Sequence, residues 1–273
     1  MSKISKLLII IVSICLSACE TNKPIVNTNT IRIITLSPHL AELVFSAGAG
    51  DNLIGVVAFS DFPEAVKSIE QVGDAFKLDY EKIITLNPSH ILAWKNGTPI
   101  AIIDKLKTLN FNVIETEINT LSDIPKTIQQ IAKLTQTESF AAKNIANFNQ
   151  TIATFKDQNY SVKSLFIEIY PKPLYTVSNK HWMSEAVRIC GYNNLFNDLS
   201  QLSAPVSLEA VITRNPQAIL NLSGQEDDQW QEWKTIEAAK NNQIITIHPD
   251  YFSRPSLRLI EGIKQLCATR KLS

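Results

Sequence analysis

Several signatures of catalysis are missing from this 273-residue chain. It contains no G-x-S-x-G elbow, no P-loop, no G-x-G-x-x-G run and no H-E-x-x-H pair. Its formal net charge is +0, which argues against nucleic acid and against an electrostatic grip on lipid headgroups. With 8 glycines and 12 prolines it is not a low-complexity chain. Its 45% hydrophobic residues are enough to bury one or two cores.

The four histidines, His39, His90, His181 and His248, show no short spacing typical of metal ligands. One alternative stays open, in which His39, His248 and a carboxylate converge on zinc or manganese in a metal-dependent hydrolase. His90 opens an expected strand, which favours a structural role. We therefore predict no enzyme, no metal site and no cofactor.

The amino terminus predicts export. Lys3 and Lys6 precede an apolar run over residues 7–16 that is too short to span a bilayer. Leu16-Ser17-Ala18-Cys19 then has the form of a bacterial lipobox, which implies cleavage before Cys19 and lipid on its thiol. We expect a signal peptide over 1–18 and a lipidated tether over 19–30. The alternative is an ordinary signal peptide cut near Ala18.

Cysteine usage agrees with an oxidising compartment. Cys15 leaves with the signal peptide and Cys19 would carry lipid, so Cys190 and Cys267 remain in the folded part. The simplest interpretation of such a pair in an exported protein is a disulfide. Closing a loop of that length contributes on the order of 4 kcal/mol in the chain-entropy model.

An internal repeat organises the folded part. Residues 80–94 read YEKIITLNPSHILAW and residues 208–224 read LEAVITRNPQAILNLSG, with identities at one constant offset. In each copy we expect a short helix that ends at Asn-Pro, because proline disfavours helical dihedrals in the residue before it. A buried strand follows. Two copies so far apart predict two similar lobes rather than a solenoid.

Strand and helix patterns alternate on both sides of one long helical stretch, which predicts parallel sheets covered by helices on both faces. The predicted fold class is α/β, with two parallel-sheet lobes joined by a single long helix and a ligand cleft between the lobes. We expect an N-terminal lobe over 31–135, a connecting helix over 136–158 and a C-terminal lobe over 159–273. Within the last lobe we expect a loop over 170–178, a helix over 229–239 and a final helix from about Pro255 to Cys267.

The loops after the strands are rich in aromatic residues. Ligands of open parallel sheets bind beyond the carboxyl ends of the strands. The rings expected there are Phe59, Phe62, Trp94, Tyr170, Tyr175, Tyr251 and Phe252. Two lobes facing across a cleft would bring them together, although any one ring has the alternative of folding back onto its own lobe.

Glu81 and Glu209 occupy the same position in the two repeat copies, each at a helix start. One interpretation is favourable placement near a helix N-terminus, worth about 0.5 kcal/mol. The other is a pair of related surface carboxylates that meet a two-fold partner. The residues alone leave both open.

Six segments, taken in order, carry a resemblance to a known family. They are IITLSPHLAELVFSAGAG, FSDFPEAVKSIEQVGD, LDYEKIITLNPSHILAW, ICGYNNLF, VSLEAVITRNPQAI and DYFSRPSLR. This set resembles the periplasmic binding proteins of ABC importers for cobalamin, over essentially all of residues 31–267. The wider group also includes siderophore and haem binders.

The resemblance implies roles for particular residues. The positions that would contact the corrin are Phe59, Trp94, Tyr175, Asp250, Tyr251, Phe252, Ser253 and Arg254. Glu81 and Glu209 match two glutamates that dock onto arginines of the permease, and Cys190 and Cys267 match the family's disulfide. The chain also departs from the pattern. Phe59 stands where the best-known cobalamin binder has tyrosine, Ala75 and Ser203 stand where it has tryptophan, and Phe76 lies beside the first of these.

The prediction is therefore a non-enzymatic, periplasmic, membrane-anchored lipoprotein. It would capture cobalamin as a transported ligand and deliver it to an ABC permease dimer with its ATPase subunits. The alternative ligand is a ferric siderophore or haem.

Overall fold

The computed structural model describes residues 31–156, 158–224 and 229–270. The expected signal peptide, Cys19 and the tether lie outside these residues. The elements of the first half are β1 (Ile33–Thr35), α1 (Pro38–Ser46), β2 (Leu53–Gly55), α2 (Tyr80–Leu86), β3 (His90–Trp94), α3 (Ile100–Thr108) and β4 (Val113–Thr116).

The first half holds a parallel sheet in the order β2-β1-β3-β4. Successive strand residues point to opposite faces of a sheet, and here both faces are covered. Ile33 and Leu92 enter one apolar core, whereas Ile34 and Ile91 enter another. Burial on both faces explains why these strands read as continuous apolar runs.

The second half repeats this arrangement and adds to it. Its elements are β5 (Lys163–Glu168), β6 (Tyr170–Pro171), β7 (Leu174–Val177), α6 (Trp182–Ile189), β8 (Tyr192–Asn194), β9 (Ser203–Pro205), α7 (Leu208–Arg214), β10 (Ala218–Asn221), α8 (Gln229–Glu232), α9 (Glu237–Lys240), β11 (Ile244–Thr246), α10 (Pro249–Phe252) and α11 (Leu259–Ala268). A parallel sheet has the order β11-β10-β5-β8, and an antiparallel sheet has the order β6-β7-β9. The predicted fold class of paired parallel α/β sheets is confirmed.

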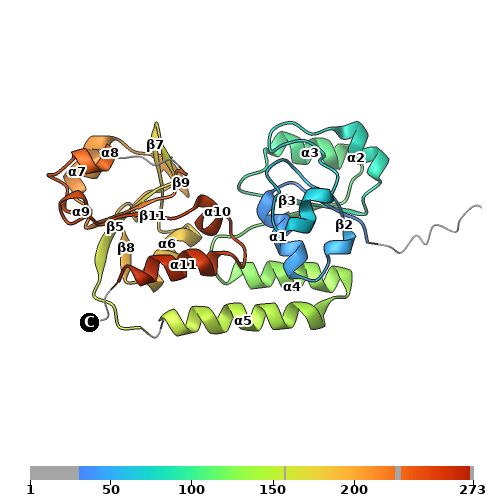
Figure 1. Cartoon of the computed structure of the whole chain (residues 1–273). Coiled ribbons are helices and arrows are strands. Elements are labelled where there is room, and N and C mark those ends of the chain that lie inside the picture. The colour runs from blue at the N-terminus through green and yellow to red at the C-terminus, as the bar shows by residue number, and fades with distance from the viewer. Residues whose placement is uncertain (1–30, 157, 225–228, 271–273) are drawn as a thin grey trace, which may run out of the picture. The chain divides into compact units, whose positions relative to one another are not determined.

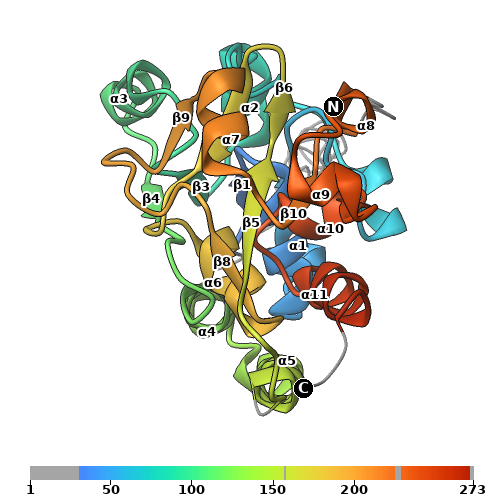
Figure 2. The ribbon, with the colours of Figure 1, turned by 90° about the vertical axis from the view of Figure 1, so that its left-hand side faces the viewer.

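Two helices connect the sheets, α4 (Asp123–Thr135) and α5 (Glu138–Lys156). Figure 1 shows α5 as one long rod, and Figure 2 shows it end-on beside α4, α6 and α11, all of which it contacts. Phe148 and Ile152 of α5 belong to an apolar core that also contains Leu92 of the first sheet and Leu220 of the second. The two halves therefore share one continuous core.

The repeat helices α2 and α7 end in the same way. Asn87 and Asn215 both adopt left-handed backbone conformations, with φ of 45° and 46°. Asparagine tolerates this region, and its N–H then bonds to a carbonyl near the end of the helix. The helix ends where the sequence predicts, but the left-handed asparagine makes the turn and the proline follows it.

Three expected elements differ from the structure. The stretch 170–178, expected to be a loop, forms the hairpin β6–β7, whose second strand also pairs with β9. The helix expected over 229–239 is divided into α8 and α9, and the last helix begins at Leu259 after the separate short helix α10. Short strands between prolines and single helical turns carry too little periodicity to be recognised.

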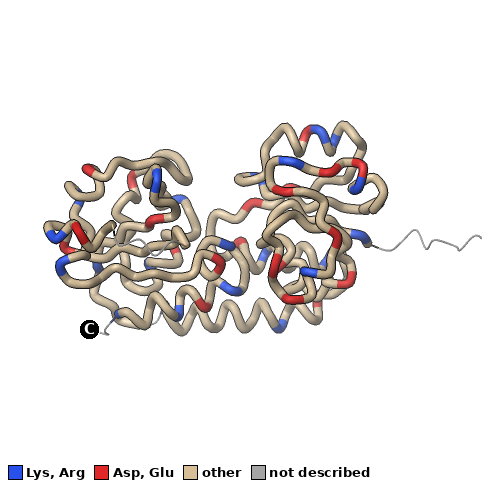
Figure 3. The backbone as a smooth tube through the Cα atoms, turned by 45° about the horizontal axis from the view of Figure 1, so that its top comes forward, with Lys and Arg blue, Asp and Glu red and all other residues tan. Residues whose placement is uncertain are grey.

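Charged residues of both signs are scattered along the described chain, as Figure 3 shows. Within the described ranges, no helix is long and apolar enough to cross a membrane.

Candidate functional site

Arg254, which follows α10, connects the two halves of the chain. Its Nη1 atom donates to Glu42 Oε1 at 3.2 Å and to Asp61 Oδ1 at 2.6 Å. Its Nη2 atom donates to the carbonyl oxygen of Phe59 at 3.1 Å and lies 3.0 Å from Asp250 Oδ1. Three of these four partners belong to the first half, so one guanidinium contacts α1, the loop after β2 and the start of α10.

Glu42 is the buried member of this cluster, at 3% exposure on α1. Its Oε2 accepts from Ser256 Oγ at 2.5 Å, and its Oε1 lies 3.2 Å from Arg258 Nη1. Burial raises the pKa of Glu42, against the lowering effects of the Ser256 hydrogen bond and the charges of Arg258 and Arg254. A buried carboxylate of this kind is tolerated because cations and hydrogen bonds surround it.

Asp61 has the opposite shift. Its partial burial opposes ionisation, but the hydrogen bond from Arg254 and the charge of that residue outweigh burial and lower the pKa of Asp61. Asp61 therefore remains a carboxylate, available to Arg254, under ordinary conditions.

Arg258 places a second cation between aromatic rings. Its guanidinium carbon lies 4.3 Å from the ring centroid of Phe62 and 5.1 Å from that of Tyr251. Both distances suit cation–π attraction. Phe62 belongs to the first half and Tyr251 to the second, so the aromatic contacts cross between the halves as the ion pairs do.

Two phenylalanines near this cluster are unusually exposed. Phe59 is 80% exposed and Phe76 is 83% exposed. Phe76 lies at the tip of a turn in which its N–H donates to Asp74 Oδ1, and the carbonyl of Gly73 at the base of that turn accepts from Ala58 N at 2.8 Å. The turn is thus bonded to the residue before Phe59. Exposed apolar rings on adjoining loops are typical of a surface that another molecule covers.

Trp94 ends β3 and is half-buried. Its ring meets the His39 ring edge-on, with centroids 5.1 Å apart. His39 Nδ1 bonds to Ser37 Oγ at 2.7 Å, whereas His39 Nε2 and Trp94 Nε1 are buried without hydrogen-bond partners. Burial, and then the charge of Arg254, lowers the pKa of His39 to about 3. His39 is therefore neutral at ordinary pH and supports Trp94 from within.

The other expected ligand residues are distributed unevenly. Tyr251 and Ser253 are half-buried beside Arg254, whereas Tyr175 lies on β7, where it pairs with Tyr170 and Pro205. Phe252 is fully buried. A Cβ added to Gly262 would lie 2.7 Å from the Phe252 ring, so glycine allows α11 to pack closely on it.

The buried position of Phe252 corrects the role expected from the sequence. The ring offers no accessible surface to a ligand and anchors α10 from inside. Neighbouring side chains on a single helical turn face in different directions, so Phe252 can be buried while Tyr251 beside it is partly exposed.

The structure does not assemble the metal site left open by the sequence. His39 is enclosed within the first half, while His248 is an exposed residue whose Nδ1 accepts from Asp250 N at 3.3 Å. Among the described residues, no group of three or more His, Cys, Asp or Glu side chains could hold a metal ion.

Glu81 and Glu209 both lie exposed in the first turn of their helices, α2 and α7. The Asp79 carboxylate caps α2 through Lys82 N at 2.9 Å, and the Ser207 hydroxyl caps α7 through Ala210 N at 3.1 Å. The first turns are therefore held alike, and each leaves its glutamate directed away from the core.

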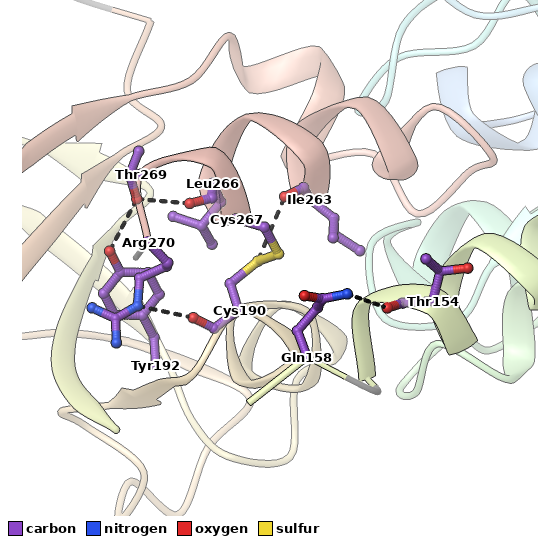
Figure 4. Close-up of a disulfide and its surroundings, with 9 residues drawn as sticks. All are labelled: Thr154, Gln158, Cys190, Tyr192, Ile263, Leu266, Cys267, Thr269 and Arg270. Carbon is purple, nitrogen blue, oxygen red and sulfur yellow. Dashed lines mark hydrogen bonds between the residues drawn. A yellow bond between two sulfur atoms is a disulfide. The ribbon is translucent and has the colours of Figure 1, made fainter. Parts of the chain in front are cut away.

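Cys190 and Cys267 form a disulfide, with Sγ atoms 1.99 Å apart. Figure 4 shows that it joins the end of α6 to α11, beside Tyr192 and Arg270. Arg270 Nε donates to the Cys190 carbonyl at 3.2 Å. The bond thus secures the helix that follows the Arg254 segment.

Sequence reasoning did not identify Glu42, Asp61, Ser256 and Arg258. One signal was present, because Glu42 is the only charged residue in the apolar stretch PHLAELVFS. A charge in such a stretch needs a partner. The identity of that partner depends on contacts between residues more than 200 positions apart.

Comparison with known proteins agrees with this architecture. A vitamin B12-binding protein of Vibrio campbellii is 34% identical over 242 residues, 86% of this chain and 88% of its own. One from Pectobacterium carotovorum is 33% identical over 87% of each chain. The crystal structure of the periplasmic vitamin B12-binding protein BtuF of Vibrio cholerae superposes with a TM-score of 0.80 at 30% identity, covering 87% of this chain and 95% of that one.

The family model for periplasmic binding proteins matches residues 33–251. This is a family of binding proteins, so the prediction of a non-enzymatic chain is confirmed. The paired sheets and the connecting helix agree with this match and with the relatives, which align over most of their length. The chain belongs to the periplasmic binding protein family.

Proposed function

We propose that this protein captures cobalamin outside the cytoplasm and delivers it to the permease of an ABC importer. The observation that carries the proposal is identity of 30–34% to vitamin B12-binding proteins over almost the whole length of both partners. The chemistry of the site supports it. Exposed rings at Phe59 and Phe76 offer apolar faces for a large, flat ligand, while Asp250 provides a polar group at the edge.

Calorimetric titration of the purified protein with cyanocobalamin tests this proposal. We expect saturable one-to-one binding that is weakened about tenfold or more by Trp94→Ala and by Asp250→Ala. Each change removes a stacking or a charge-assisted polar group. The absence of cobalamin binding by the wild-type protein would refute the proposal.

A ferric siderophore or haem is the second candidate ligand. A possible iron-binding protein of Staphylococcus epidermidis superposes with a TM-score of 0.75 at 26% identity, covering 87% of this chain. Haem and several ferric siderophores belong in the same titration series. Tighter binding of one of these than of cobalamin would make the second candidate the function.

We propose that Glu81 and Glu209 dock onto basic residues of the permease. Their matching positions at helix starts would give each lobe one anchor, and such rim charges set orientation and encounter rate. Replacing either by alanine should leave cobalamin binding unchanged but impair uptake, and replacing both by lysine should abolish uptake. Glu138→Ala, which removes an exposed first-turn carboxylate from α5, is the matched control. Normal uptake by the double lysine variant would exclude docking.

We also propose that the mature protein is a periplasmic lipoprotein, with a disulfide formed after export. The lipobox-like segment before Cys19 supports this proposal. Membrane fractionation and mass spectrometry should find a lipid on Cys19, and Cys19→Ala should release the protein into the soluble fraction. A wild-type protein that is already soluble would contradict the anchor.

A further inference from the structure

Tyr170 is an exposed aromatic residue at the carboxyl end of a parallel strand. It is 54% exposed and lies on β6, which directly follows β5. Ligands of parallel sheets bind beyond the carboxyl ends of the strands. The same end of this sheet carries α10, with Asp250 and Tyr251, after the parallel strand β11. Tyr170 therefore lies on the edge of the second half that also carries the candidate site.

The antiparallel sheet β6-β7-β9 has one face packed on its own half. Leu174 and Thr176 of β7 are buried, and so is Ala204, which pairs with Thr176. Leu174 belongs to the apolar core that also contains Phe166 of β5. Side chains of successive strand residues point to opposite faces, so the residues between these ones face the other way.

Tyr170 lies on that other face, beside Tyr175. The register pairs Tyr170 with Tyr175 of β7, and Tyr175 with Pro205 of β9. Directly paired residues of antiparallel strands share one face, with Cβ atoms about 4.5–5.5 Å apart. Tyr175 is half-buried and Pro205 is exposed. The three residues form one row across the sheet, so Tyr170 is turned away from the core of its own half.

The chemistry of this row suits an uncharged part of a ligand. Its three side chains are two phenol rings and a proline ring, none of which is charged. Among the described residues, neither tyrosine hydroxyl has a hydrogen-bond partner. The backbone under the row is held on both sides of β7, because Ile169 N donates to the Tyr175 carbonyl at 3.0 Å and Val206 N donates to the Leu174 carbonyl at 2.9 Å. An apolar ring with a polar tip fits a partner that is apolar on its face and polar at its edge.

We infer that Tyr170 contacts the ligand, as a second ring beside Tyr175 in a wall formed by β6, β7 and β9. This inference rests on the proposed function. It adds to the ligand residues implied by the family resemblance, which include Tyr175 but not Tyr170. The ring supplies apolar surface, and the hydroxyl bonds to a polar group at the ligand's edge.

Binding affinities of matched variants test the contribution of the ring. Cyanocobalamin is titrated into the wild type, Tyr170→Thr and Tyr170→Phe, and threonine is chosen because it favours strands and so retains the hairpin. We expect Tyr170→Thr to bind about five- to tenfold more weakly, and Tyr170→Phe to stay within about threefold of the wild type. Lys172→Gln, an exposed change in the turn of the same hairpin, is the control and should bind as the wild type does. Wild-type affinity in Tyr170→Thr would overturn the inference and leave the proposed function standing.

Chemical footprinting tests the contact in the unchanged protein. Tetranitromethane nitrates accessible tyrosines, and mass spectrometry of the peptides measures the rate at each position with and without saturating cyanocobalamin. Bound ligand should slow nitration of Tyr170 and leave that of Tyr160 unchanged, because Tyr160 lines a hollow beside α6. Equal nitration of Tyr170 in the free and the cobalamin-bound protein would overturn the inference.

The same footprint with haem separates this inference from the proposed function. If the wild type binds haem but no cobalamin, and haem protects Tyr170, the proposed function fails and the contact stands. If haem binds in place of cobalamin and Tyr170 is nitrated as in the free protein, both fail.

Discussion

Acidification should destabilise this protein through His39. The folded chain holds His39 neutral down to a pKa of about 3, because its ring is buried and lies near the charge of Arg254. In the unfolded chain the same ring is protonated with the ordinary pKa of about 6.5. Below about pH 6.5 the unfolded state therefore binds more protons than the folded state, and stability falls as the pH falls.

The size of the effect follows from these two values. At pH 5 the unfolded ring has taken up its proton and the folded ring has not, which costs about 2 kcal/mol of unfolding free energy. His181, whose pKa burial lowers to about 4, adds a similar amount at that pH. Glu42 acts in the opposite direction, since its raised pKa favours the folded state on acidification. Because these groups have opposite effects, the free energy of unfolding of the wild type is compared with that of a His39 variant at each pH.

Urea unfolding of the wild type and of His39→Asn at pH 7 and pH 5 measures the effect. Asparagine can keep the bond to Ser37 but cannot be protonated, so the variant should lose about 2 kcal/mol less between the two pH values. His248→Asn is the control, because that side chain is 63% exposed. An equal loss in the wild type and His39→Asn would show that His39 is protonated in the folded protein.

Three further outcomes test other parts of the structure. Non-reducing mass spectrometry of exported protein should find Cys190 linked to Cys267, and replacing both by serine should cost about 4 kcal/mol; two free thiols would contradict the bond. Trp230→Phe should lower the free energy of unfolding by about 1–3 kcal/mol, because the buried Glu168 carboxylate loses the indole N–H that donates to it. An unchanged midpoint of urea unfolding would show that another donor compensates. Ligand binding should hardly alter the small-angle scattering profile, because α5 packs into a core shared by both halves; sharp compaction would indicate a hinge.

The sequence predicts those parts of the fold that depend on local patterns. The two Asn-Pro turns, the buried strands after them and the long apolar stripe of α5 each lie within a short window, so their periodicity is visible. Helix α9 is different. Its start is fixed by Asn215, whose side-chain oxygen accepts from Glu237 N at 2.8 Å, and no window that reads only 229–239 contains that information.

The candidate site also has features that follow from local sequence and features that depend on distant contacts. The exposed aromatic loops follow from the position of each loop after its strand, and Phe59, Asp250, Tyr251 and Arg254 do meet at one place. What the residues cannot indicate is which side chains bind ligand and which bind one another. Arg254 is expected from the sequence to contact ligand, but its hydrogen bonds to Glu42 and Asp61 of the other half could not be expected from the sequence.

The two copies of the repeat have similar helix starts but different contacts at the helix ends. Both first turns are capped by a side-chain oxygen at the same position, and both carry a glutamate at the same place. The two helices end in the same backbone conformation, but the surroundings of these ends differ. In the second half Asn215 and the Pro216 carbonyl accept the first amides of α9, whereas in the first half Asn87 and Pro88 line an open hollow of about 490 Å³. The capped starts of α2 and α7 are therefore equivalent, and the two-fold partner that we propose would meet Glu81 and Glu209 there.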